Sequence, residues 1–348
     1  MTGTEKIMKQ RVLEKKKLPE FLDEILKTRA VIAPVKEEDH SVYSPLKKGA
    51  DVCLDFLRPM KSAKEVFFPQ NEVMFYFNQR TQKMVEPPPA GETLLFGVTP
   101  CDLAGIAAQD KLFSSGEFKD SYYLRRRKQT IIAGMGCPEP GETCFCHSFG
   151  IDRFSSAVAD LFFNPLEDRF VIDVNTQNGE ELVKNLPEAS EKELEELKKL
   201  KGEIPQFSME PIPLEDMVKV VGEHFDSPVW DEVAMRCIGC AACTFVCPTC
   251  HCFDITDETR KDVGRRMRTW DGCMFPKFTL HASGHNPRTQ AGQRMRQRVL
   301  HKFSYFNDNQ GIISCTGCGR CVEVCPVNLD IRDILKRLSE YILETSDK

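Results

Sequence analysis

Short apolar runs alternate with stretches of helical spacing in the first half of the chain. The runs at 30–35, 93–98 and 129–135 are almost wholly apolar, which predicts short buried strands. A helix that begins near Pro19 precedes the first run, and LAGIAAQDKLF continues at helical spacing after the second. Strands and helices that alternate in this way are typical of a partly parallel α/β sheet.

Two further strand signals and a linker complete this pattern. Residues 66–77 are aromatic and strand-like but interrupted at Pro69, and residues 161–174 are typical of a hairpin. A charged helix is expected at about 190–202. The stretch PQFSMEPIP then predicts an extended linker, which places a domain boundary near 205–215.

The 348 residues include 16 cysteines. A chain of this length can bury a large core without covalent help, so disulfides are not needed for its stability. The first 26 residues are charged throughout and lack the apolar stretch of a secretory signal, and no run of 18 apolar residues predicts a membrane span. We therefore expect a cytoplasmic protein whose cysteines serve metal or redox chemistry.

The second half of the chain contains the same cysteine motif twice. Residues 237–248 read CIGCAACTFVCP and residues 315–326 read CTGCGRCVEVCP, so both follow Cys-x2-Cys-x2-Cys-x3-Cys-Pro. In two-cluster ferredoxins the first three cysteines of such a motif bind one [4Fe–4S] cluster, and the fourth reaches the other cluster. Zinc sites also use Cys-x2-Cys, but zinc requires neither the third cysteine at this spacing nor the Cys-Pro ending.

The motif therefore predicts eight ligands for two [4Fe–4S] clusters. The first cluster is expected on Cys237, Cys240, Cys243 and Cys325. The second is expected on Cys315, Cys318, Cys321 and Cys247. Three other cysteines lie in this half, and we interpret them as packing beside the clusters: Cys250, Cys252 and Cys273.

These motifs define the expected domains. An N-terminal α/β domain at 1–205 precedes a ferredoxin-like domain at 215–348, which would carry a long insertion at about 253–312. A two-cluster core can tolerate such an insertion because the entropy of loop closure grows slowly with loop length.

Four more cysteines gather in the N-terminal half: Cys101, Cys137, Cys144 and Cys146. Cys101 and Cys137 each follow the carboxyl end of a predicted strand, where α/β sheets bind ligands. If those strands are neighbours, the two thiols face one crevice. The spacing alone leaves open a third [4Fe–4S] cluster, a zinc site that includes His147, and four unligated thiols. Cys53 lies alone between apolar residues, and we interpret it as a core residue.

Charge and missing motifs narrow the function. Residues 260–303 hold 11 Lys or Arg against 2 Asp or Glu, a local charge of +9 in a chain of net charge −5. No nucleic-acid-binding motif accompanies this basic stripe, so we predict that it offsets anionic clusters and docks an acidic partner, with Arg265, Arg266 and Arg268 involved. The chain also lacks a P-loop, a nucleophile elbow and a G-x-G-x-x-G turn, so hydride and substrate chemistry is expected in another subunit.

Several stretches resemble one family of dicluster ferredoxin subunits. They are FGVTPCDLAGI, DSYYLRRR and CPEPGETCFCHSFG in the first half, then WDEVAMRCIGCAACTFVCPTCHCFD, RTWDGCMF, SGHNPRT and CTGCGRCVEVCP. Members of this family include the β subunit of cytosolic NiFe sulfhydrogenases and the A subunit of anaerobic sulfite reductase. Related subunits accompany heterodisulfide-reductase-type complexes. The resemblance runs from about residue 65 to 330 in the same order.

The resemblance implies an iron–sulfur electron-transfer subunit without catalysis of its own. Such a subunit relays single electrons between a flavoprotein subunit that binds FAD and NAD(P)H and a catalytic subunit, which is a hydrogenase, a sulfite reductase or a heterodisulfide-reductase-type enzyme. The resemblance also implies a third [4Fe–4S] cluster on the four N-terminal cysteines. The alternative is a reductase subunit that binds its own substrate in the cysteine-lined N-terminal crevice.

Overall fold

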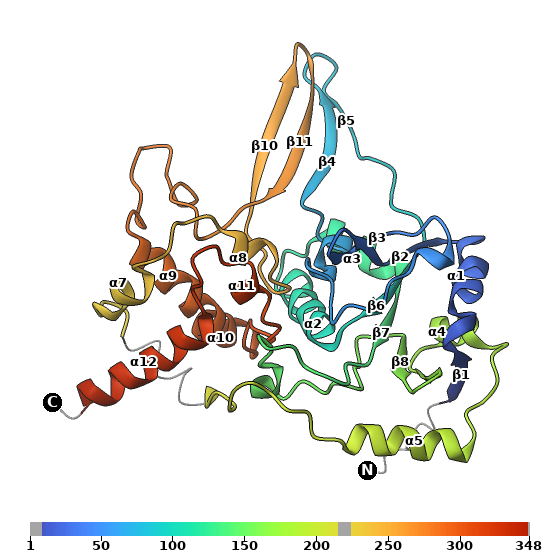
Figure 1. The fold of residues 1–348 in the computed structure, drawn as a ribbon. Helices are drawn as coiled ribbons and strands as arrows, with labels where there is room; N and C mark the ends of the chain where they lie inside the picture. Colours follow the sequence, from blue (N-terminus) through green and yellow to red (C-terminus); the bar gives the residue numbers. More distant parts are fainter. Residues whose placement is uncertain (1–8, 215–223, 347–348) are drawn as a thin grey trace, which may run out of the picture.

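The computed structural model describes residues 9–214 and 224–346, and it shows a mixed α/β chain with a larger sheet in its N-terminal half (Figure 1). Seven strands form this sheet, in the order β1 (Gln10–Glu14), β9 (Arg169–Val174), β8 (Leu161–Pro165), β7 (Thr130–Met135), β6 (Thr93–Val98), β2 (Ala30–Glu37) and β3 (His40–Pro45). Strands β2, β6, β7 and β8 run parallel to one another, and the other neighbours are antiparallel.

The central strands are the apolar runs that the sequence predicts as strands. All residues of β6 are buried, and in β7 only Met135 is partly exposed. Continuous burial is expected for parallel strands that are covered on both faces. The runs at 30–35, 93–98 and 129–135 form β2, β6 and β7, and the predicted hairpin forms β8 and β9.

Helices and two apolar cores cover the larger sheet. The helices of this half are α1 (Leu18–Leu26), α2 (Pro100–Ser114), α3 (Ser121–Gln129), α4 (Gln177–Val183) and α5 (Glu191–Gly202), with short helical turns at η1 (Lys15–Lys17), η2 (Gly49–Asp51), η3 (Ala63–Val66) and η4 (Cys146–Phe149). Successive residues of β6 belong to different cores, since Leu94 packs with α1 and Leu95 packs with α2. The predicted capping box of α5 is present at Ser190 and Glu193.

A second, smaller sheet joins the two halves of the chain. Its strand order is β10 (Phe253–Arg260), β11 (Val263–Trp270), β4 (Asn71–Asn78) and β5 (Lys83–Val85). Figure 1 shows this sheet projecting from the rest of the molecule. Strand β4 begins after Pro69, as expected, but its partner β11 comes from the C-terminal half. Sequence reasoning did not predict this pairing, because nothing local in either strand specifies its partner.

The arginines of β11 do not form the free basic surface that the sequence suggests. Arg265 pairs with Glu258 at 2.7 Å, and Arg266 pairs with Asp257 at 2.7 Å. Arg268 is only 2% exposed and pairs with Glu72 at 2.5 Å across the β11–β4 boundary. Their positive charge is therefore offset within the sheet, which argues against these three arginines as the docking surface for an acidic partner.

The C-terminal half is built from short helices around one apolar core. Its helices are α7 (Val229–Ala234), α8 (Ala242–Phe245), α9 (Ala291–Leu300), the π-helix η5 (His301–Tyr305), α10 (Phe306–Gln310), α11 (Arg320–Glu323) and α12 (Ile331–Ser346). Trp230, Val299 and Leu335 lie in the centre of this core, and half-buried cysteines of both motifs pack against it. No helix among the described residues is long and apolar enough to cross a membrane.

Candidate metal centres

The two cysteine motifs adopt the same local backbone. Gly239 and Gly317, which occupy the same position in each motif, have φ values of 69° and 60°. Two residues later Ala241 and Gly319 have φ values of 57° and 77°, and each precedes a short helix, α8 or α11. A left-handed residue turns the chain sharply and is costly for alanine. The repeated conformation therefore indicates a shared structural purpose rather than a chance repeat of cysteines.

The first cysteine group consists of Cys237, Cys240, Cys243 and Cys325. All four line one small cavity in the C-terminal half. Cys325 comes from the second motif, and its sulfur accepts a hydrogen bond from the Leu329 N–H at 3.2 Å. The fold therefore brings the fourth cysteine of one motif to the first three of the other, which is the arrangement that the spacing predicts.

The second cysteine group consists of Cys315, Cys318, Cys321 and Cys247. Burial raises the pKa of Cys315 to about 11, and the neighbouring charges of Cys247 and Cys318 add to this rise. Burial also raises the pKa of Cys321, where Cys318, Cys247 and Cys315 act in the same sense. The geometry agrees, since Lys302 Nζ donates both to Cys247 Sγ at 3.2 Å and to the carbonyl of Ser314, the residue before Cys315, at 2.9 Å, so Cys247 lies beside the second motif as well as in its own.

The N-terminal cysteine group consists of Cys101, Cys137, Cys144 and Cys146. Because β6 and β7 are parallel neighbours, Cys101 and Cys137 follow them at the same edge of the sheet. The loop that follows brings Cys144 and Cys146 to the same place, and all four cysteines line one cavity. Burial raises the pKa of Cys137 to about 11 and that of Cys146 to about 12, so a bound metal would have to displace these thiol protons.

A zinc site that includes His147 is not favoured by this geometry. His147 does not line the cavity of the N-terminal cysteine group, and its ring stacks on Phe207 with 3.8 Å between centroids. In the described part of the chain, no three His, Cys, Asp or Glu side chains converge closely enough to hold a single metal ion. The cysteines of the first group and of the N-terminal group surround cavities instead, as ligands of a multinuclear cluster would.

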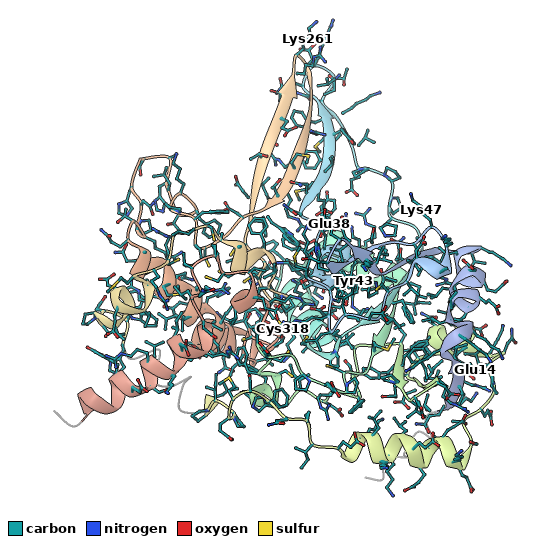
Figure 2. The ribbon with its side chains drawn as sticks, in the orientation of Figure 1. Glu14, Glu38, Tyr43, Lys47, Lys261 and Cys318 are labelled. Carbon is teal, nitrogen blue, oxygen red and sulfur yellow. The ribbon has the colours of Figure 1, made fainter. Side chains whose placement is uncertain are left out.

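The three cysteine groups lie in a row. Cys318 of the second group also lines the cavity of the N-terminal group, and Cys321 of the second group also lines the cavity of the first. The second group is therefore in the middle, and Figure 2 places Cys318 between the larger sheet and the C-terminal helices. Direct backbone contact supports this order, since the Phe145 N–H donates to Gly317 O at 2.8 Å.

A buried ion pair fixes the junction between the N-terminal and second groups. Arg320 and Asp102, each 1% exposed, form two hydrogen bonds of 2.7 and 2.8 Å. Asp102 follows Cys101 and Arg320 precedes Cys321, so the pair holds one cysteine-containing loop against the other. Its bidentate geometry gives it directional specificity. The sequence contains both residues beside cysteines, but nothing in it indicates that they meet.

Two other buried cations provide a test of whether anionic clusters fit these sites. Arg298 and Lys302 are each 4% exposed, and neither forms an ion pair with a carboxylate in the described ranges. Lys302 Nζ instead donates to Cys247 Sγ at 3.2 Å and to Ser314 O at 2.9 Å. Arg298 donates to Cys243 O at 3.3 Å and faces Cys250 Sγ at 3.8 Å. Uncompensated buried cations cost several kcal/mol, and thiolate-bound iron–sulfur clusters would supply the missing negative charge.

The remaining cysteines lie beside these groups. A hydrogen bond between Cys250 and Cys247 lowers the pKa of Cys247 and raises that of Cys250. Cys252 and Cys273 form a similar pair at the base of the β10–β11 hairpin. Their interpretation as packing residues stays a prediction. Cys53 is half-buried and lines a separate cavity.

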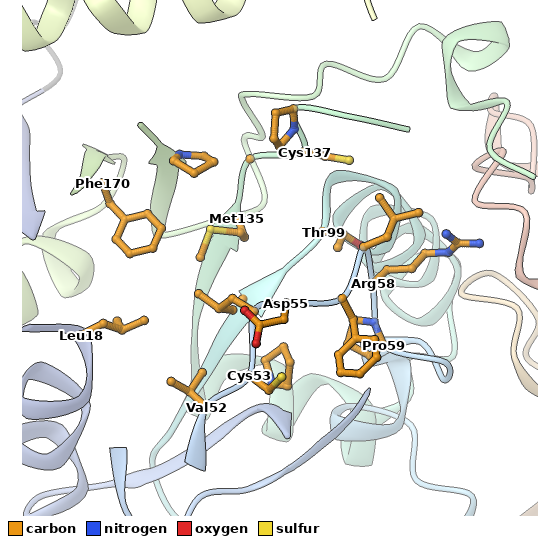
Figure 3. Close-up of a pocket in the computed structure, with 18 of the residues that line it drawn as sticks. Leu18, Val52, Cys53, Asp55, Arg58, Pro59, Thr99, Met135, Cys137 and Phe170 are labelled. Atoms are coloured by element: carbon orange, nitrogen blue, oxygen red, sulfur yellow. The ribbon is translucent and has the colours of Figure 1, made fainter. Parts of the chain in front are cut away.

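That separate cavity, of about 690 Å³, adjoins the N-terminal cysteine group (Figure 3). It lies at the carboxyl ends of β6 and β7, and its lining is mostly apolar, with Leu18, Met135 and Phe170 among its walls. Four residues line both this cavity and that of the N-terminal cysteine group: Leu57, Arg58, Thr99 and Cys137. Its volume is in the range of small-molecule sites.

Comparisons with known proteins agree with this architecture. A family model described as a 4Fe-4S dicluster domain matches residues 236–329. The protein named sulfhydrogenase 2 subunit beta, from Pyrococcus furiosus, is 32% identical over 330 residues, which cover 93% of this chain and 97% of the relative. No solved structure matches the chain. At this identity and coverage, the chain belongs to the sulfhydrogenase β-subunit family, an iron–sulfur electron-transfer family.

Proposed function

We propose that this chain relays single electrons through three [4Fe–4S] clusters between a flavin- and NAD(P)H-linked partner subunit and a catalytic subunit of an oxidoreductase complex. The order of the three cysteine groups carries the proposal. Cys318 of the second group also lines the cavity of the N-terminal group, and Cys321 of the second group also lines the cavity of the first. A relay requires its centres to lie within short range of one another, and this order provides such a row. The relative's name, a subunit of a sulfhydrogenase, supports a catalytic partner.

The protein's own residues would hold, orient and shield the clusters. Twelve cysteines would bind them: Cys237, Cys240, Cys243 and Cys325 the first, Cys315, Cys318, Cys321 and Cys247 the second, and Cys101, Cys137, Cys144 and Cys146 the third. An iron–sulfur cluster, when bound, supplies reversible one-electron chemistry. Arg298 and Lys302 would offset cluster charge, and the Asp102–Arg320 pair would keep the third site against the second.

Metal analysis and reduction test this proposal directly. Twelve ligands predict about 12 iron and 12 sulfide per chain after anaerobic purification. The isolated chain should accept electrons from dithionite but should not oxidise NADH or NADPH. A content of about eight iron would mean that the N-terminal cysteine group binds no cluster. Stoichiometric zinc would mean that this group is a structural zinc site. Nucleotide oxidation by a flavin-free preparation would contradict the relay.

The cavity of Figure 3 favours a second candidate function, reduction of a small molecule by the chain itself. Asp55 points into this mostly apolar space, and Cys137 lies in the wall that it shares with the N-terminal cysteine group. A substrate bound there should perturb the absorption or EPR spectrum of a cluster at that site. Spectra that stay unchanged on titration with sulfite, polysulfide and disulfide compounds would leave the relay as the sole function.

A further inference from the structure

The loop of the first cysteine group presents apolar side chains to solvent beside the proposed cluster. Ile238 is 65% exposed and Met235 is 80% exposed, and Cys240 is itself exposed. Ile238 also lines the cavity of the first cysteine group. A cluster in that cavity would therefore be separated from the molecular surface by no more than one side chain.

Two cations border these apolar residues. Arg236 lies between Met235 and Cys237 in sequence, and Lys277 follows Pro276, whose ring lies beside the space that a side chain at Gly239 would occupy. Both cations are exposed, and neither has an ion pair or hydrogen bond to its side chain in residues 9–214 and 224–346. They differ in this from Arg265, Arg266 and Arg268, whose charges are offset inside the small sheet. Two exposed positive charges without an ion pair among the described residues therefore lie at this loop.

We propose that Met235, Arg236, Ile238 and Lys277, here called the loop patch, form the docking surface for an acidic redox protein. The inference rests on the proposed function. It adds where on the surface one redox partner binds and which chemistry that partner must present. Exposed apolar groups mark interaction sites, and an apolar centre with a polar rim is the usual composition of an interface. The partner should present apolar side chains around its own redox centre and carboxylates at the rim, which Arg236 and Lys277 would attract. Electron-transfer contacts of this kind lie at the small end of interface sizes, and these four residues would form the centre of one.

Binding and electron transfer to a probe protein test the loop patch. The probe is a small acidic ferredoxin, and the full cluster-loaded chain is used at low salt. We expect Ile238→Asp, and separately the double variant Arg236→Glu with Lys277→Glu, to raise the dissociation constant about tenfold or more and to slow electron transfer from the reduced ferredoxin. Added salt should weaken binding of the wild-type chain, because the rim charges are exposed.

A matched control comes from the other half of the chain. Ile204 is 95% exposed and lies in the extended segment after α5, so Ile204→Asp should leave both binding and transfer unchanged. Wild-type values in the loop-patch variants, or tighter binding of a basic cytochrome c than of the ferredoxin, would overturn the proposal. Iron content and reduction by dithionite are measured on every sample. If a variant loses iron or is no longer reduced by dithionite, the proposed clusters themselves are affected. If both are retained, a change in binding or transfer reports on the docking surface alone.

Discussion

Replacement of Cys247 by Ala should damage the cluster proposed for the second motif, although Cys247 belongs to the first. Lys302 Nζ links the Cys247 sulfur, at 3.2 Å, to the carbonyl of Ser314 beside Cys315, at 2.9 Å, and Cys325 in turn lines the cavity of the first cysteine group. The variant should lose up to about four iron, or convert one cluster to a three-iron form, because one of four thiolate ligands is missing. Iron analysis and EPR of the reduced and oxidised protein would measure the change.

A neighbouring cysteine provides the control for this experiment. Cys250 hydrogen-bonds to Cys247 but is assigned no ligand role, so Cys250→Ala should retain all of the iron. Cys325→Ala should affect the other cluster and leave the signal of the second group intact. If Cys247→Ala changes only the cluster on Cys237, Cys240 and Cys243, then each motif closes on itself and the crossed assignment is wrong.

The sequence predicts the parts of this molecule whose cause is local. Apolar runs of strand length give β2, β6 and β7, and the spacing of each cysteine motif fixes a tight loop with left-handed turns at Gly239 and Gly317. The expectation that Cys101 and Cys137 face one crevice depended on one condition, that the strands before them are neighbours. The structure meets this condition, because β6 pairs with β7. Local pattern and simple topology were sufficient for these features.

The features that depend on distant contacts were not predictable in this way. The pairing of β4 with β11 joins residues almost 200 positions apart, and the basic stripe gave no sign that Arg268 would be buried against Glu72. Charge counted along a sequence does not reveal which charges face solvent. The same stripe includes Arg298 and Lys302, whose buried positions near thiols give them a different role from a surface cation. A buried lysine or arginine cannot be distinguished from an exposed one by residue type, so only the fold shows which cations are buried.

Replacement of Lys302 by Met should lower the reduction potential of the second cluster. Lys302 Nζ lies 3.2 Å from Cys247 Sγ, in a buried environment where a positive charge acts strongly. Reduction adds one negative charge to a cluster, and the ammonium group stabilises that reduced form. A loss of about 1.4 kcal/mol of this stabilisation would lower the potential by about 59 mV, the value of a tenfold change for one electron. A redox titration followed by EPR would measure it.

One variant separates this electrostatic effect from general damage, and a second tests whether another buried cation acts in the same way. Lys192 is exposed on α5, far along the chain from any cysteine motif, and Lys192→Met should leave every potential unchanged. Arg298 faces Cys243 O and Cys250 Sγ. Burial lowers the pKa of Arg298, and neighbouring thiols that include Cys321 of the second group raise it. Because Arg298 lies near both groups, Arg298→Met should lower the potentials of both the first and the second cluster. Lys302→Met should retain full iron content, because methionine has a similar length and Cys247, the proposed ligand, is still present. An unchanged potential in an iron-replete Lys302→Met protein would mean that the ammonium group serves the fold, through Ser314 and Thr249, and has no influence on electron flow.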